Sequence, residues 1–194
     1  MSTLTERLAI HAAQLVVDGG ARDVEQAIRL AVERLGAAPS AAPTAGLVRQ
    51  HLQPMLMQSL GADGYAAMTR RRLEVAEETM TVFAERNDVL DVVLAGRAAA
   101  GHLDGDLALH VRVYTRRRIG ELAQDLVDVG FAEPRFATAE TRFGRLDRLI
   151  FVDGDVEVIV TRCLPEQRGE AARDLFNGRR VAHVRLPALR SAIA

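Results

Sequence analysis

The segment from residue 93 to residue 109 has the residue types and the order that point most directly to chemistry. It contains a run of branched residues, a glycine turn at Gly96, a short connection and a second strand-like run that opens with Asp106. A glycine turn lets backbone amides approach a phosphate group. Carboxylates at the start of the next strand can hold divalent cations that stabilise the attacking and leaving oxygens of a phosphoryl transfer. The segment therefore predicts a site for a phosphate-bearing ligand and a divalent cation.

This segment resembles the nucleotidyltransferase superfamily, which has the polymerase-beta-like fold. The family pattern is a strand followed by Gly-Ser, an aspartate–apolar–aspartate triplet on a second strand, and a third carboxylate on a later strand. Ala95-Gly96 or Gly96-Arg97 aligns with Gly-Ser, Asp106-Leu107-Ala108 with the triplet, and Glu157 with the third carboxylate. The resemblance covers roughly residues 89–162. The whole chain is also similar to a group of proteobacterial proteins of comparable length.

The resemblance implies a role for each aligned residue. Asp106 and Glu157 would be the catalytic carboxylates and would hold Mg²⁺ across neighbouring strands, with Asp104 as a substitute ligand. Gly96 and the amides after it would face the phosphate groups, and Arg97 would neutralise their charge. The implied ligand is a nucleotide or an RNA.

Two departures from the family pattern bear on activity. The serine of Gly-Ser is missing, and Ala108 stands where the second metal-binding carboxylate is expected. Mg²⁺ requires nearly complete octahedral oxygen coordination, and alanine offers no oxygen. We therefore favour a catalytically degenerate member that acts as a nucleotide-, nucleic-acid- or protein-binding or regulatory module.

Two other interpretations stay open. One is an active Mg²⁺-dependent nucleotidyltransferase that moves a nucleoside monophosphate onto a protein, an RNA or a small molecule. The other is an unrelated α+β protein, which would be established by a strand order in which residues 106–113 and 155–161 are not neighbours.

Two arginine triplets add candidates for binding. Arg70-Arg71-Arg72 is followed by glutamates at helical spacing, which predicts a solvated, salt-bridged helix face. The second triplet, Arg116, Arg117 and Arg118, opens a predicted helix, where the helix dipole disfavours cations. We expect the second triplet to lie near a polyanion such as a nucleotide phosphate or an RNA backbone.

The order of the predicted elements indicates an α+β fold, with an N-terminal helical region followed by a nucleotidyltransferase-like mixed sheet with flanking helices. Residues 1–36 are expected to form a helical hairpin, 37–46 a linker, and 47–194 the α+β domain. The hairpin helices, Leu4–Val17 and Val24–Leu35, are a candidate surface for a protein partner. Further helices are expected near 44–60, 65–85, 119–129 and 186–193, and strands near 89–94, 107–113, 136, 146–152 and 156–160.

Composition excludes several classes of protein. The chain has 194 residues, a net charge of −1 and a single cysteine, Cys163, so a disulfide framework and a zinc ribbon are excluded. All of its basic residues are arginines, which excludes sites built on a lysine. No long uncharged apolar run is present, which predicts a cytoplasmic protein with no membrane partner. The sequence leaves the oligomeric state open.

Overall fold

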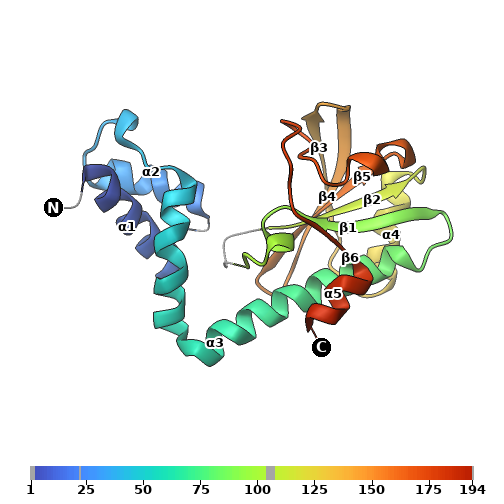
Figure 1. The fold of residues 1–194 in the computed structure, drawn as a ribbon, viewed down its shortest axis with the longest axis horizontal. Helices are drawn as coiled ribbons and strands as arrows, with labels where there is room; N and C mark the ends of the chain where they lie inside the picture. Colours follow the sequence, from blue (N-terminus) through green and yellow to red (C-terminus); the bar gives the residue numbers. More distant parts are fainter. Residues whose placement is uncertain (1–2, 22, 104–107, 194) are drawn as a thin grey trace. The chain divides into compact units, whose positions relative to one another are not determined.

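The computed structural model describes residues 3–21, 23–103 and 108–193 (Figure 1). The helices are α1 (Leu4–Val17), α2 (Val24–Arg34), α3 (Ala45–Ala84), α4 (Ile119–Asp128) and α5 (Leu186–Ile193). The strands are β1 (Val89–Ala95), β2 (Leu109–Thr115), β3 (Arg135–Thr141), β4 (Gly144–Asp153), β5 (Val156–Cys163) and β6 (His183–Arg185). The predicted α+β class is confirmed. Within the described ranges, no helix combines the length and the apolar character that crossing a membrane requires.

The helical unit, which extends to Thr69, is built around its own core. Helix α1 begins after Thr3, whose hydroxyl accepts from the amide of Glu6, and α2 begins after Asp23, which caps the amide of Gln26. The core of this unit combines residues of α1, α2 and the first part of α3: Leu8, Ala12, Leu15, Val24, Ala27, Ala31, Val48 and Leu52.

The expected linker at 37–46 lies inside this unit. Ala37, Ala41 and Ala45 pack against the same core, and the chain divides into compact units at Thr69 and Arg70 instead. The sequence did not predict this packing, because alanine buries little surface and the run of small residues shows no clear hydrophobic period. Helix α3 bends at Gly61, whose φ of 71° is not helical. This bend separates the two helical stretches expected near 44–60 and 65–85.

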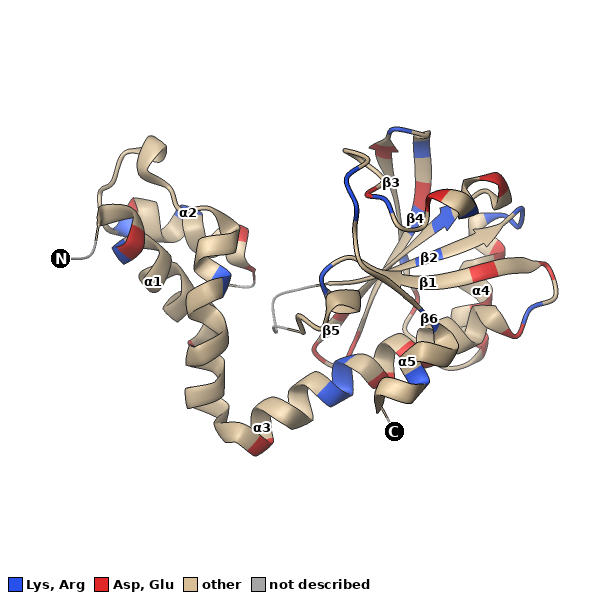
Figure 2. Ribbon diagram, in the orientation of Figure 1, with Lys and Arg blue, Asp and Glu red and all other residues tan. Residues whose placement is uncertain are grey.

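The second compact unit, which begins at Arg70, contains a six-stranded mixed sheet of order β3-β4-β5-β2-β1-β6. Strands β2 and β5 are parallel, and the other neighbouring pairs are antiparallel. The turn at Asp153-Gly154-Asp155 joins β4 to β5 as expected, and Phe136 lies on the edge strand β3. In the ribbon of Figure 2, the positions of basic and of acidic residues are interspersed over this unit rather than gathered in separate regions.

The two faces of the sheet are covered differently. On one face, the last part of α3 packs with α4 and α5 over the main core, which includes Val75, Phe83, Val111, Leu122, Val160 and Leu189. On the opposite face, a smaller cluster joins Tyr114 and Cys163 to Ala171 and Leu175 of the segment that follows β5. Residues that alternate with the core positions of β2, β4 and β5 therefore point toward this second face.

Candidate functional site

The pairing of β2 with β5 bears directly on the expected metal site. Leu109 lies opposite Val158 in a parallel register, so Ala108 and Glu157 are the residues just before this pair. Glu157 is exposed, and it alternates with the core residues Val156 and Val158. It therefore belongs to the face that the helices leave uncovered. Because β2 and β5 are neighbours, the strand order that would establish an unrelated fold is not found, and the family relationship stays a prediction.

The expected aspartate ligands, Asp104 and Asp106, lie outside the described residues. Among the residues that are described, no group of three or more His, Cys, Asp or Glu side chains could hold a metal ion. Glu157 supplies a single carboxylate, and Ala108 beside it supplies no oxygen. The described residues thus do not fit an octahedral Mg²⁺ site, and we derive no step through a metal ion.

The glycine turn is present, but its first amide is already bonded. Gly96 follows β1 with a φ of 85°, the left-handed region that glycine adopts without strain. Its amide donates to the carbonyl of Ala182 at 2.9 Å. The amide of Gly96 is therefore not free for a phosphate group, contrary to the expectation. Arg97 comes next, is exposed and opens a short helical turn.

The arginine triplet at 116–118 lies at the other end of the sheet. Ala95, which precedes Gly96, pairs with His110 at the start of β2, whereas Arg116 follows Thr115 at its end. Arg116, Arg117 and Arg118 therefore lie at the opposite end of β2 from Gly96, and their expected contact with a polyanion stays a prediction. Local periodicity predicts the strand but not which of its ends faces the ligand.

Carboxylates explain why this triplet is tolerated at the start of α4. Arg117 forms ion pairs with Asp88 and with the buried Asp125. Arg116 pairs with Glu166, and the amide of Arg118 donates to Glu121 at 2.6 Å. These contacts compensate the unfavourable position of the cations near the helix dipole.

The uncovered face of the sheet carries a row of polar residues that sequence reasoning did not single out. Thr161 of β5 lies opposite Arg112 on β2 and opposite Arg148 on β4. The three residues line a pocket of about 110 Å³, together with Gly96 and His110. The alternation of polar and apolar residues in β2 was the available signal for Arg112, but the meeting of three strands has no local signature.

Positive charge predominates among the side chains that line this pocket. Arg112 is buried, and its Nη1 donates to the carbonyls of Ala171 and Arg173, at 3.2 and 2.8 Å. The Nε of Arg148 is buried without a hydrogen-bond partner, and its guanidinium lies 5.2 Å from the ring centre of Phe176. Burial is the largest cause that lowers the pKa of Arg148, and the positive charge of the nearby Arg112 lowers this pKa further.

His110 responds to the same environment. Part of the residue is exposed, yet its position lowers the pKa of the imidazole to about 4. Loss of hydration is the largest cause, followed by the charges of Arg148 and Arg112, while Asp174 opposes them. The imidazole is therefore neutral at pH 7 and adds no charge to the pocket.

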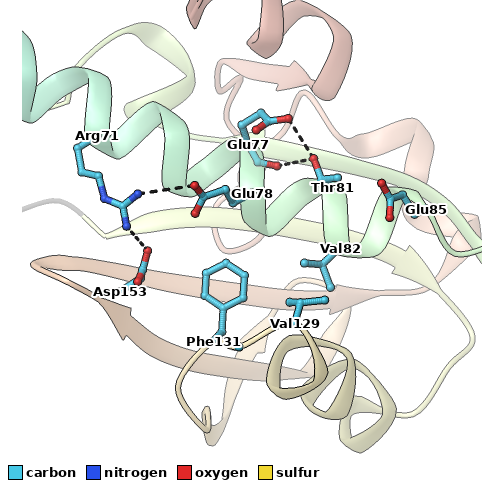
Figure 3. A pocket seen from close by; sticks show the side chains of 10 residues that line it. Arg71, Glu77, Glu78, Thr81, Val82, Glu85, Val129, Phe131 and Asp153 are labelled. Carbon is cyan, nitrogen blue, oxygen red and sulfur yellow. Dashed lines mark hydrogen bonds and ion pairs between the residues drawn. The ribbon is translucent and has the colours of Figure 1, made fainter.

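A larger hollow, of about 550 Å³, lies on the helix-covered side of the same unit (Figure 3). Phe131 and Val129 line it opposite the carboxylates of α3, and Arg71 bridges Glu78 and Asp153. The expected solvated face of the first arginine triplet holds for Arg70, which pairs with Glu74. The expectation is wrong for Arg72, which is only 1% exposed. Consecutive residues of a helix point in different directions, so the triplet extends from the polar side of α3 to its core-facing side.

The helical unit offers the surface expected for a protein partner. Leu4, Ile10 and Leu35 are exposed there, and Ile10 and Leu35 line a shallow hollow with His11. Nothing in the structure tests a partner on this surface, which stays a prediction.

Comparisons of this chain with protein-family models, with curated proteins and with solved structures gave no match. The function proposed below therefore depends on the residue pattern of the sequence and on the geometry of the site.

Proposed function

We propose that this protein is a catalytically degenerate relative of the nucleotidyltransferases, which binds a phosphate-bearing ligand such as a nucleotide without transferring it. The supporting observation is the parallel pairing of β2 and β5. This pairing sets Glu157 level with Ala108, so one carboxylate of the family layout is present and the neighbouring one is replaced by a methyl group. Binding on the uncovered face then depends on arginines rather than on a bridging metal ion.

The alternative is the active Mg²⁺-dependent transferase. It is favoured by the same neighbouring strands, because β2, the strand that Asp106 is expected to open, pairs with the strand of Glu157. In this alternative, Asp106 and Glu157 hold the metal ion, and Asp104 is the substitute for the carboxylate that Ala108 lacks.

A thermal-shift titration separates the two functions. The four nucleoside triphosphates are tested with and without Mg²⁺ on the wild type and on the Asp106→Ala and Glu157→Gln variants. Our proposal predicts that at least one nucleotide raises the melting temperature without Mg²⁺, equally in all three proteins, and that no pyrophosphate is released. A ligand at a hundred times its Kd adds about 2.7 kcal/mol to the free energy of unfolding, which is readily detected.

A shift that requires Mg²⁺, disappears in Asp106→Ala and accompanies pyrophosphate release would establish the active transferase instead. The absence of a shift with every nucleotide would contradict both functions.

A further inference from the structure

Three residues with hydrogen-bond donors line the pocket on the uncovered face from neighbouring strands. Arg112, Thr161 and Arg148 are opposite one another on three neighbouring strands, with Thr161 in the middle. Adjacent strands are about 4.8 Å apart, so the backbones of the two arginines are separated by about 10 Å. Both long side chains line the same small pocket as Thr161.

The two guanidinium groups are not neutralised by carboxylates. None of the ion pairs between described residues involves Arg112 or Arg148. Arg112 is only 6% exposed, and the Nε of Arg148 has no acceptor. Asp174 is the one carboxylate among the described residues lining the pocket, and it accepts from the amides of Phe176 and Asn177.

Such an arrangement is costly unless an anion completes it. Buried cations are ordinarily paired, and an unsatisfied buried donor carries a penalty of about 1–3 kcal/mol. Two guanidinium groups facing one pocket also repel each other. A bound anion would supply acceptors for both and remove the repulsion.

The size of the pocket indicates the class of anion. A volume of about 110 Å³ corresponds to three or four water molecules at about 30 Å³ each, which suits one tetrahedral oxyanion and is too small for a whole nucleotide. The planar donor fork of arginine matches phosphate oxygens, and the Thr161 hydroxyl adds a further donor.

We infer that the uncovered face of the sheet holds a site for a single phosphate group, bound over Thr161 between the guanidinium groups of Arg112 and Arg148. The inference rests on the proposed function for the class of ligand, whereas its residues come from the geometry of the three strands. The remainder of a phosphate ester would lie outside the pocket, next to Phe176, which is 54% exposed.

The test is a calorimetric titration of the full chain with sodium phosphate, against sodium chloride at the same ionic strength. We expect phosphate to bind and Arg148→Gln to weaken binding by about tenfold or more, since a charge-assisted contact is lost. Arg145→Gln is the matched control, because Arg145 is an exposed arginine on the same strand and does not line the pocket. It should change the affinity by less than about twofold.

Three outcomes would overturn this site. They are the absence of phosphate binding by the wild type, equal losses in Arg148→Gln and Arg145→Gln, and nucleotide binding that Arg148→Gln leaves unchanged. The last outcome would leave the proposed function standing. Conversely, phosphate binding that depends on Arg148, with no binding of any nucleotide, would support the site and contradict the nucleotide-binding function.

Two further measurements complete the test. If Arg148→Gln does not fold, amide spectra of the wild type decide: phosphate must shift the signals of Arg112, Arg148 and Thr161, and unchanged signals would overturn the site. Adenosine monophosphate distinguishes the source of the phosphate. Tighter binding than inorganic phosphate, lost in Phe176→Ala, indicates an ester, and equal binding indicates free phosphate.

Discussion

At the scale of single residues, the buried carboxylate of Asp125 holds Arg117, the middle arginine of the triplet at 116–118. Asp125 pairs with Arg117 and with Arg86 and is only 5% exposed. Removal of one partner from a buried ion pair typically costs about 3–5 kcal/mol. We expect Asp125→Asn to lower the free energy of unfolding by about 3 kcal/mol in denaturant melts.

The control for this prediction is Asp128→Asn, because Asp128 is an exposed aspartate of the same helix that accepts a hydrogen bond from Gln124. It should change the stability by less than about 0.5 kcal/mol. Equal effects of the two substitutions would contradict a structural role for the triplet.

His110 predicts a pH dependence of stability. The pKa of its imidazole is about 4 in the fold, against an ordinary value of 6.5. As the pH falls below 6.5, the imidazole of His110 becomes protonated in the unfolded chain but stays neutral in the folded protein. The free energy of unfolding therefore decreases until about pH 4, where the folded protein is protonated as well. Denaturant melts at pH 7 and pH 5 should show a larger loss for the wild type than for His110→Gln. Equal losses would mean that the imidazole titrates normally.

At the scale of elements, the turn after β1 depends on the backbone conformation of one glycine. An alanine at Gly96 meets no atom within 4 Å, so only its φ of 85° opposes the substitution. We expect Gly96→Ala to cost about 1–2 kcal/mol of unfolding free energy. Gly120→Ala is the matched control, since Gly120 lies in α4 and is equally unobstructed. It should be neutral or stabilising by up to about 1 kcal/mol; a comparable loss there would contradict a conformational origin.

The elements also show what local sequence could and could not predict. Period and caps located the helices and strands well, including the start of α2 at Asp23 and the hairpin at Gly154, because these signals act within a few residues. The sequence did not predict that Arg112, Thr161 and Arg148 lie opposite one another, because this depends on the register of three strands that are distant in sequence. The packing of Ala171 and Leu175 against part of the face that the helices leave uncovered was not predicted for the same reason.

At the scale of the whole molecule, the two units have separate cores. The helical core ends at residues of the first part of α3, and the cores on the two faces of the sheet begin with Leu73. We expect the fragment 70–194 to fold alone, with a cooperative thermal transition and the circular dichroism of a mixed sheet. A fragment that stays unfolded would show that the sheet unit requires the helical unit.

The central claim is that the uncovered face of the sheet binds a phosphate-bearing ligand without the help of a metal ion. The most direct test is a titration of the isotope-labelled full chain with ATP in the absence of Mg²⁺, followed by amide spectra. The account predicts shifts at Gly96, Arg112, Arg148 and Thr161, and their loss in Arg148→Gln. Spectra that do not change at these residues would contradict it.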